Sequence, residues 1–416
     1  YEIGSGLVGS EMCIRDSPRG ASDKSGRTFN NPYQYFFEQM HMDDAIYADE
    51  SIYEYPMQQG GGNDGRPYSF GRPSSGGSKA AYPCKSYGQG RINPAYFYGV
   101  FDPNDMRRDV SITMTGSNGK GVEKLIPFVP NSKAEGGGLT LNKWDENRQA
   151  NPWVAAQRKS CINGPYMRMS EVYLGYAEVC AALGDVVTGK QYLKTVRERS
   201  FPQGLANTDA FIASFGNDLV RAIIEERGFE YAGEGDRRWT LIRSGYLPED
   251  IKRIKDMTKA MMDGLATKGY YEFENGNIIS AYIWTKLVDA KTIYGHRLTA
   301  QCPTDKVNDP VLYPGWRGQK DNWEEMGLNY GSSTPATNLA IKGLFEIVSE
   351  EEAASLESQG YAKVNWGIDL VDYRDEYDKY LFWDYDYVSA PIYLWPFTPN
   401  VMAAGGFTNG YGFKQE

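Results

Sequence analysis

Histidine is scarce in this sequence, and cysteine forms no recognisable motif. The 416 residues include two histidines, His41 and His296, which disfavours a zinc site built on histidine ligands. The five cysteines contain no Cys-x-x-Cys pair, which argues against zinc ribbons and thioredoxin-type redox motifs. No run of 18 apolar residues occurs, so we expect no membrane-spanning helix. We also expect no metal site and no cofactor.

Positive charge is in deficit, and the usual catalytic motifs are missing. Lys and Arg total 44 against 54 for Asp and Glu, a formal net charge of −10. A nucleic-acid binder needs a basic face for phosphates, so this balance argues against nucleic acid as a partner. No Gly-x-Ser-x-Gly, Walker loop or His-Glu-x-x-His is present. The Gly-x-Gly-x-x-Gly at Gly4 to Gly9 has no strand before it, and we attribute it to chance.

Aromatic residues, glycine and proline are abundant instead. The chain has 31 Tyr, 9 Trp, 46 Gly and 21 Pro. This composition is typical of long loops that carry many flat, amphipathic rings. Such a surface suits the binding of sugars or peptides better than it suits redox chemistry.

The first residues have an unusual composition. The chain begins with Tyr1, and residues 7–17 resemble a translated sequencing adapter. We therefore interpret residues 1–17 as a non-native or disordered leader and residues 18–416 as one domain. Within that domain we expect a helical core over about residues 160–245 and a loop-rich part over residues 246–416.

Hydrophobic periodicity predicts the main elements. Before residue 160 we expect a partly helical segment over 29–52, a strand over 50–57, a loop over 59–78, and a hairpin of 110–115 with 122–129. After it we expect a helical hairpin of tetratricopeptide-repeat character over 166–183 and 188–199, a third helix over 209–232, and short helices over 251–266 and 337–348. Gly175 and Ala177 are the small residues expected where the two hairpin helices approach closely. The predicted fold class is mainly α, with long irregular loops and a few short β-hairpins.

A set of carboxylates spaced four apart lies near the end of the third predicted helix. Glu226, Glu230 and Glu234 would share one helix face, with Arg227, Arg237, Arg238 and Arg243 within reach. One hypothesis is acid–base chemistry, for instance glycoside hydrolysis. The other is an Arg–carboxylate network that stabilises the helix end. We favour the second, because nearby arginines lower the pKa of a glutamate and make it a poor general acid.

At these residues the chain resembles the SusD/RagB family of Bacteroidetes outer-membrane lipoproteins. The pattern is Glu-Arg-x-x-Glu-aromatic-x-x-Glu-Gly-x-Arg followed by Leu-x-Arg, here Glu226, Arg227, Glu230, Tyr231, Glu234, Gly235, Arg237, Leu241 and Arg243. Three further segments agree in order: Glu50 to Tyr53, Phe101 to Asp109, and Arg168 to Glu178. Thr240 departs from the family pattern, which usually has Asp there. The C-terminal segment also resembles the family's only loosely.

The resemblance implies a non-catalytic protein of the cell surface. Family members have tetratricopeptide-like helix pairs beneath irregular loops, bind oligosaccharides or, in some branches, peptides, and cap a SusC-like TonB-dependent transporter. They are attached to the extracellular face of the outer membrane by a lipidated N-terminal cysteine. We expect the signal peptide, that cysteine and the first helix pairs to be absent from this sequence. A peptide-binding member remains an alternative, and a glycosidase is a weaker one.

The expected ligand site lies on loops and uses aromatic rings as its floor. In the family the ligand loops lie partly between the Glu-x-Ile strand and the Asp-x-Arg-Arg segment. Rings that no helix or strand period explains are the first candidates there, and a second group lies in a later Gly-, Pro- and Asn-rich loop. The candidates are Tyr68, Phe70, Tyr82 and Tyr87 in the first loop, and Trp316, Trp323 and Tyr330 in the second.

Overall fold

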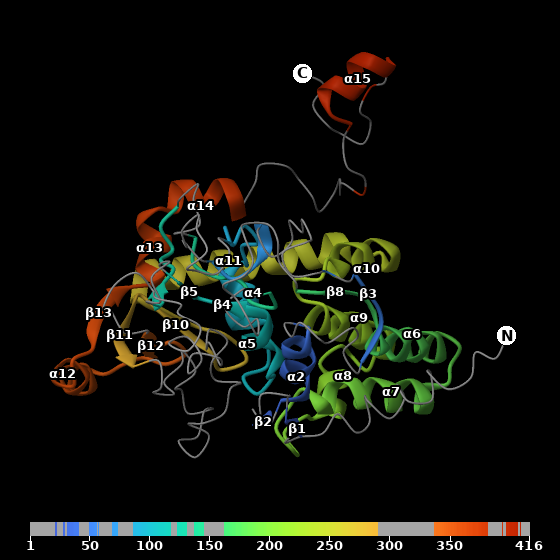
Figure 1. Ribbon diagram of the computed structural model, residues 1–416, viewed down its shortest axis with the longest axis horizontal. Coiled ribbons are helices and arrows are strands. Elements are labelled where there is room, and N and C mark those ends of the chain that lie inside the picture. The colour runs from blue at the N-terminus through green and yellow to red at the C-terminus, as the bar shows by residue number, and fades with distance from the viewer. Residues whose placement is uncertain are drawn as a thin grey trace.

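The computed structural model of the protein shows a mainly α architecture with short strands (Figure 1). It describes residues 21–22, 28–29, 31–40, 50–55, 57, 69–73, 86–117, 123–130, 137–144, 162–289, 337–381, 393, 397–406 and 408. The proposed leader over 1–17 lies outside these residues, as do Tyr68, Tyr82, Trp316, Trp323 and Tyr330. Among the described helices, none combines the length and the apolar character needed to cross a membrane.

The predicted helical hairpin is present at one end of the molecule (Figure 1). It consists of α6 (Met169–Ala182) and α7 (Val186–Arg199). The turn between them uses Gly184 in a left-handed conformation, and Asp185 caps α7 by accepting a hydrogen bond from the Thr188 amide at 3.1 Å. Tyr173, Leu174 and Ala177 are buried against α7 and α9, as the helical period predicts.

Two details of this helical region differ from the prediction. The close approach is made by Gly189 of α7, where a Cβ would lie 2.9 Å from the Ala177 carbonyl oxygen, whereas a Cβ at Gly175 would meet nothing. The third helix is two helices, α8 (Thr208–Ala213) and α9 (Leu219–Glu230). Gly216 and Asn217 both have positive φ, which ends α8, and Asp218 then caps α9. The chain continues into α10 (Asp236–Ser244).

The 22-residue helix α11 (Leu247–Lys268) crosses the molecule above the central elements (Figure 1). Its Met261, Met262 and Leu265 are buried in the largest apolar core. That core also receives rings from α4 (Pro94–Gly99) and residues of a three-stranded antiparallel sheet in the order β12–β11–β13. The strands are β11 (Tyr282–Asp289), β12 (Thr337–Lys342) and β13 (Ala362–Asn365).

The helix expected over residues 337–348 is therefore wrong. Residues 337–342 pair with β11 along six positions, from Trp284 opposite Lys342 to Asp289 opposite Thr337. Leu339, Ala340 and Ile341 are all buried, and a short apolar run buried on both faces carries no helical or strand period of its own. The sheet partner, far away in sequence, decides the conformation.

Short elements complete the fold. The helix α2 (Pro32–Gln39) buries Tyr33, Phe36 and Phe37 within the segment expected to be partly helical. The predicted strand over 50–57 is β3 (Ser51–Tyr55), which pairs with β8 (Gly164–Arg168). The predicted hairpin is β5 (Thr115–Ser117) with β6 (Glu123–Leu125), but Val110 and Ser111 belong to α5 (Arg107–Ser111). The remaining strands are β1 (Ala21–Ser22), β2 (Thr28–Phe29), β4 (Ile112–Thr113), β7 (Thr140–Leu141), β9 (Tyr270–Glu272) and β10 (Ile278–Ser280), and the remaining helices are α12 (Glu350–Ser358), α13 (Gly367–Asp372), α14 (Arg374–Leu381) and α15 (Pro399–Gly405).

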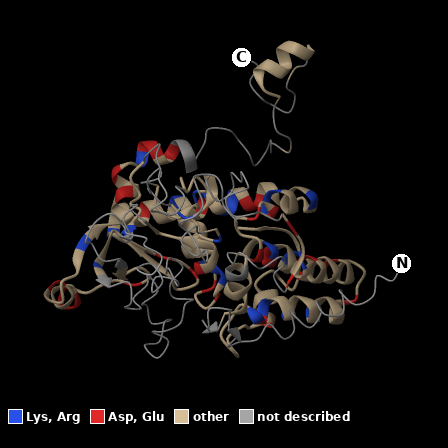
Figure 2. Ribbon diagram, in the orientation of Figure 1, with Lys and Arg blue, Asp and Glu red and all other residues tan. Residues whose placement is uncertain are grey.

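Acidic and basic residues are mixed along the helices, as on α10 and α11, rather than gathered into regions of one sign (Figure 2). On α11, for example, Lys252 pairs with Asp256 and Lys259 with Asp263. Such i, i+4 pairs on an exposed helix face contribute little to stability individually. They leave this face without a field of one sign that would steer a charged ligand.

Candidate functional site

A buried ionic network connects α5, α7, α9, β3 and β8. Its centre is Glu230, the last residue of α9, whose side chain is fully buried. The Glu230 carboxylate accepts hydrogen bonds from Arg168 at 2.7 Å and Arg107 at 3.1 Å, and it also pairs with Arg199. Three arginines from three separate elements therefore meet on one carboxylate.

The other carboxylates extend this network without leaving it. Glu226, one turn before Glu230, accepts from Arg107 at 2.7 Å and from Arg197 at 2.8 Å. Glu50, which directly precedes β3, accepts from Arg168 at 3.0 Å. The other contacts are Glu50 with Arg199 and Asp105 with Arg107. Each of these carboxylates contacts at least one guanidinium. The network therefore connects elements that lie far apart in the sequence.

Glu234 belongs to the network, but with other partners than the sequence suggested. Helix α9 ends at Glu230, and Gly233 and Gly235 take positive φ, so Glu234 leaves the helix face that carries Glu226 and Glu230. Its carboxylate accepts hydrogen bonds from Lys143 at 2.6 Å and from Arg168 at 2.9 Å.

The nearby arginines have partners elsewhere. Arg237 contacts Glu225 and Asp250, each at 2.8 Å, and Arg243 contacts Glu178 of α6. The arginines that are near Glu234 in the sequence are therefore not its partners, because the left-handed turn at Gly233 and Gly235 redirects the chain.

The charges of the network balance. It holds five cations, Arg107, Lys143, Arg168, Arg197 and Arg199, and five carboxylates, Glu50, Asp105, Glu226, Glu230 and Glu234. Burial alone would raise the pKa of Glu230, but its three arginines hold the pKa well below its usual range. Burial lowers the pKa of Lys143 to about 8. Glu230 therefore belongs to an Arg–carboxylate network at the helix end, which is the arrangement that the favoured hypothesis predicts.

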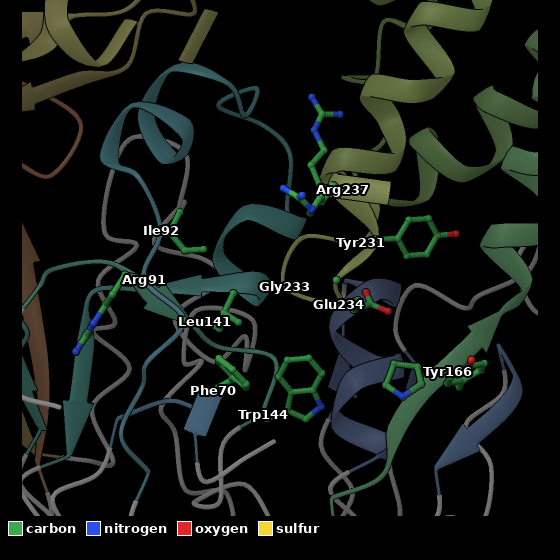
Figure 3. Close-up of a pocket in the computed structure, with 14 residues that line it drawn as sticks. Phe70, Arg91, Ile92, Leu141, Trp144, Tyr166, Tyr231, Gly233, Glu234 and Arg237 are labelled. Atoms are coloured by element: carbon green, nitrogen blue, oxygen red, sulfur yellow. The ribbon is translucent and has the colours of Figure 1, made fainter. Parts of the chain in front are cut away.

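A pocket of about 790 Å³ lies against this network (Figure 3). That volume is within the roughly 300–1,000 Å³ typical of small-molecule sites. Its wall comes from five segments far apart in sequence: Phe70, residues 90–92, the β7 end with Leu141 and Trp144, the start of β8 with Pro165 and Tyr166, and the α9–α10 turn with Tyr231, Gly233, Glu234, Gly235, Arg237 and Arg238.

Glycines bring two of these segments together. Gly233 has φ +83°, and a Cβ there would lie 2.6 Å from Cδ2 of Leu141. Gly90 approaches the same side chain, because its Cβ would lie 2.7 Å from Cδ1 of Leu141. The α9–α10 turn and the segment before α4 can therefore pack on Leu141 only because they lack side chains there.

Four aromatic side chains contribute to the pocket wall. The Tyr166 side chain is 75% exposed and that of Phe70 is 45% exposed, whereas Trp144 and Tyr231 are buried. The Tyr231 hydroxyl lies 3.0 Å from Ser170 Oγ, which fixes the ring. In Figure 3 the Arg237 guanidinium points away from Phe70 and Trp144, consistent with its pairing to Glu225 and Asp250. The wall therefore combines aromatic rings with the polar side chains of Arg91, Glu234, Arg237 and Arg238.

The structure places one predicted site residue in this pocket. Phe70 lines it, whereas Tyr87 is half-buried and does not belong to its wall. Sequence reasoning missed Trp144, Tyr166 and Tyr231. Tyr166 was assigned to a helix and Tyr231 to the family motif, so neither was considered as a surface for ligand. Their signal was position: Trp144 and Tyr231 directly follow Lys143 and Glu230 of the ionic network, and Tyr166 lies two residues before Arg168.

The architecture defines a mainly α protein in which a pocket with four aromatic rings adjoins a buried Arg–Glu network. The family model of the SusD family matches residues 12–397, and the chain therefore belongs to that family. It is 28% identical to SusD-like protein P25 of Formosa agariphila over 160 residues, 38% of this chain and 26% of that protein. The match thus spans about a quarter of that relative's length.

Solved structures similar to this chain include two from Bacteroides thetaiotaomicron. A SusD homolog has 18% identity and a TM-score of 0.41, over 62% of this chain and 55% of that one. Surface glycan-binding protein A, solved in complex with laminarihexaose, has 16% identity and a TM-score of 0.37, over 59% of this chain and 53% of that one. The chain spans about half the length of these relatives.

Proposed function

We propose that this SusD-family protein binds an oligosaccharide at the cell surface without catalysis and passes it to a SusC-like TonB-dependent transporter. In this proposal the protein is held on the extracellular face of the outer membrane by a lipid anchor. Family membership supports the class of function, and the aromatic pocket supports the class of ligand. The pocket is the observation that carries the proposal, because rings can cover the C–H face of a sugar while polar groups bond its hydroxyls.

The ionic network argues against the glycosidase alternative. A glycosidase needs one carboxyl group that can donate a proton and a second that acts as base or nucleophile. Glu234 is a carboxylate of the pocket wall, and Lys143 and Arg168 both contact it. Its neighbour Glu230 has its pKa held well below the usual range by three arginines. This pair serves a fixed fold better than proton transfer.

The proposal is tested by electrophoresis through native gels cast with starch, laminarin, xylan, galactomannan or pectin. We expect retardation by at least one polysaccharide and no release of new reducing ends. Phe70→Ala should weaken binding of the retarding polysaccharide about two- to tenfold, from about 0.5–1.5 kcal/mol of ring contact. Phe397→Ala is the matched control, since Phe397 is similarly exposed and outside the pocket. Binding to a peptide library but to no polysaccharide would favour the peptide-binding alternative.

A further inference from the structure

A row of uncharged side chains projects from the two-stranded sheet of β3 and β8. Tyr53 is 50% exposed, Tyr55 56% and Tyr166 75%, and Ile52 and Met167 are exposed beside them. We call these five side chains the aromatic ribbon. Isolated exposed apolar side chains are ordinary, but a contiguous group of them marks a binding surface. The pairing of Tyr53 with Met167 and of Tyr55 with Gly164 places them on one small sheet.

The aromatic ribbon is continuous with the pocket. Tyr166 belongs to both, because it lines the pocket and its ring meets that of Tyr53 edge to face, with centroids 5.6 Å apart. Figure 3 shows Tyr166 on its strand at the edge of the pocket. A ligand that leaves the pocket over Tyr166 therefore reaches Tyr53 without crossing a gap in the row of rings.

The sheet that carries the ribbon is fixed from beneath. Glu54 points inward between Tyr53 and Tyr55, is fully buried, and accepts hydrogen bonds from Asn163 at 2.8 Å and from Ser51. At the other end, Arg168 closes β8 with its contacts to Glu50 and Glu230. The rings are thus held by the ionic network, and a ligand does not have to order the backbone when it binds.

The chemistry of the ribbon selects its occupant. All five side chains are uncharged, and the tyrosine hydroxyls can donate and accept hydrogen bonds. An anionic lipid or a phosphorylated peptide needs cations, which these side chains do not supply. A neutral sugar chain offers C–H faces for the rings and hydroxyls at its edges. The five residues of β3 extend about 15 Å, so the ligand must continue for several sugar units beyond the pocket.

We infer, resting on the proposed function, that the ligand is a linear neutral oligosaccharide that continues from the pocket onto the aromatic ribbon. The pocket would hold one end of the chain, and Tyr166, Tyr53 and Tyr55 would carry the following units. The affinity for the oligosaccharide then rises with its number of sugar units, and this rise depends on the aromatic ribbon alone. The surface acts as a selector for polymer fragments over disaccharides.

The test is calorimetric titration with pairs of two-unit and six-unit sugars: maltose and maltohexaose, laminaribiose and laminarihexaose, cellobiose and cellohexaose, xylobiose and xylohexaose. We expect the six-unit member of the bound pair to bind more tightly. Tyr53→Ala combined with Tyr55→Ala should reduce six-unit affinity about tenfold and leave two-unit affinity unchanged. Phe70→Ala should weaken both. Tyr282→Ala is the control, because Tyr282 is an exposed tyrosine on β11 at the other end of the molecule.

The outcomes separate the two proposals. The role of the ribbon is overturned if two-unit and six-unit sugars bind with equal affinity. It is also overturned if the double variant keeps the higher affinity for the six-unit sugar. Either result leaves the proposed function standing. Binding of none of these sugars, together with no retardation in the polysaccharide gels, overturns the proposed function and this inference with it. An unchanged melting temperature shows that the variants are folded.

Discussion

The ionic network and the pocket lie side by side and share Glu234, yet they are built on opposite principles. In the network every carboxylate meets a guanidinium or ammonium group, and almost no surface is accessible. In the pocket, rings and glycine backbone lie beside Arg91, Glu234, Arg237 and Arg238, with Phe70 and Tyr166 open to solvent. The comparison shows that buried charge fixes positions in the network, whereas the pocket leaves aromatic rings exposed.

The two regions are also mechanically linked. Glu230 ends α9 and Arg168 ends β8. Tyr231 directly follows Glu230, Tyr166 lies two residues before Arg168, and both line the pocket. The network therefore determines where the rings stand. Changes in the network should act on stability first, and changes in the rings should act on binding alone.

The largest effect is expected from Glu230→Ala. The substitution removes the carboxylate shared by Arg107, Arg168 and Arg199 and leaves buried cations with fewer partners. We expect a loss of about 3–5 kcal/mol in the free energy of unfolding. Urea denaturation measures it, with the exposed Glu249 as a matched control through Glu249→Ala. A loss under about 1 kcal/mol would show that the network does not hold the fold.

The stability of the wild type should also depend on pH through Glu230. The pKa of Glu230 is held below its usual range in the folded protein, so the unfolded chain takes up its proton first as the solution is acidified. Stability from this group is present above the unfolded pKa of about 4.3 and is lost as pH falls below it. Melting temperatures of the wild type and of Glu230→Gln, recorded from pH 7 to pH 3, should converge. Parallel curves would contradict the assignment.

The two regions also differ in how far the sequence predicts them. The network residues on α9 could be found because their spacing matches a family pattern. The burial of Tyr173, Leu174 and Ala177 on α6 was also predicted correctly, although Val172, Tyr176 and Val179, which share the apolar period of that helix, are exposed. The partners of Glu234 could not, since Gly233 and Gly235 redirect the chain and Lys143 arrives from 91 residues away. The pocket is lined by five segments that are far apart in the sequence. Of the two described candidates, Phe70 and Tyr87, only Phe70 lines it.

Next in size is Leu174→Ala, which tests the predicted helical hairpin outside the network. Leu174 is fully buried between α6, α7 and α9, so truncation leaves a cavity and should cost about 2–5 kcal/mol. Val179, on the same helix, is 53% exposed, and Val179→Ala should change little. Similar melting temperatures for both variants would contradict the described packing of α6.

A smaller effect is expected at the turn that the two regions share. Gly233 and Gly235 both have positive φ, but only at Gly233 would a Cβ meet a neighbour, Leu141. Gly235→Ala should cost about 1–2 kcal/mol from backbone strain. Gly233→Ala should cost about 1 kcal/mol more and also weaken sugar binding, because it displaces Leu141 in the pocket wall. Equal losses of stability for the two variants would mean that Leu141 moves aside freely.

The smallest effect on stability is expected for a solvent-exposed ion pair outside the network. Arg243 of α10 donates from its two terminal guanidinium nitrogens to the Glu178 carboxylate of α6, and Nη2 lies 2.7 Å from Oε2. The Arg243 side chain is about half exposed. A double-mutant cycle of Arg243→Ala and Glu178→Ala should give a coupling energy of about 0.2–1 kcal/mol, because water and salt screen an exposed pair. Raising the salt concentration should reduce it further. A coupling as large as the loss at Glu230 would mean that burial is not what separates the network from the surface, and the contrast between the two regions would then rest on geometry alone.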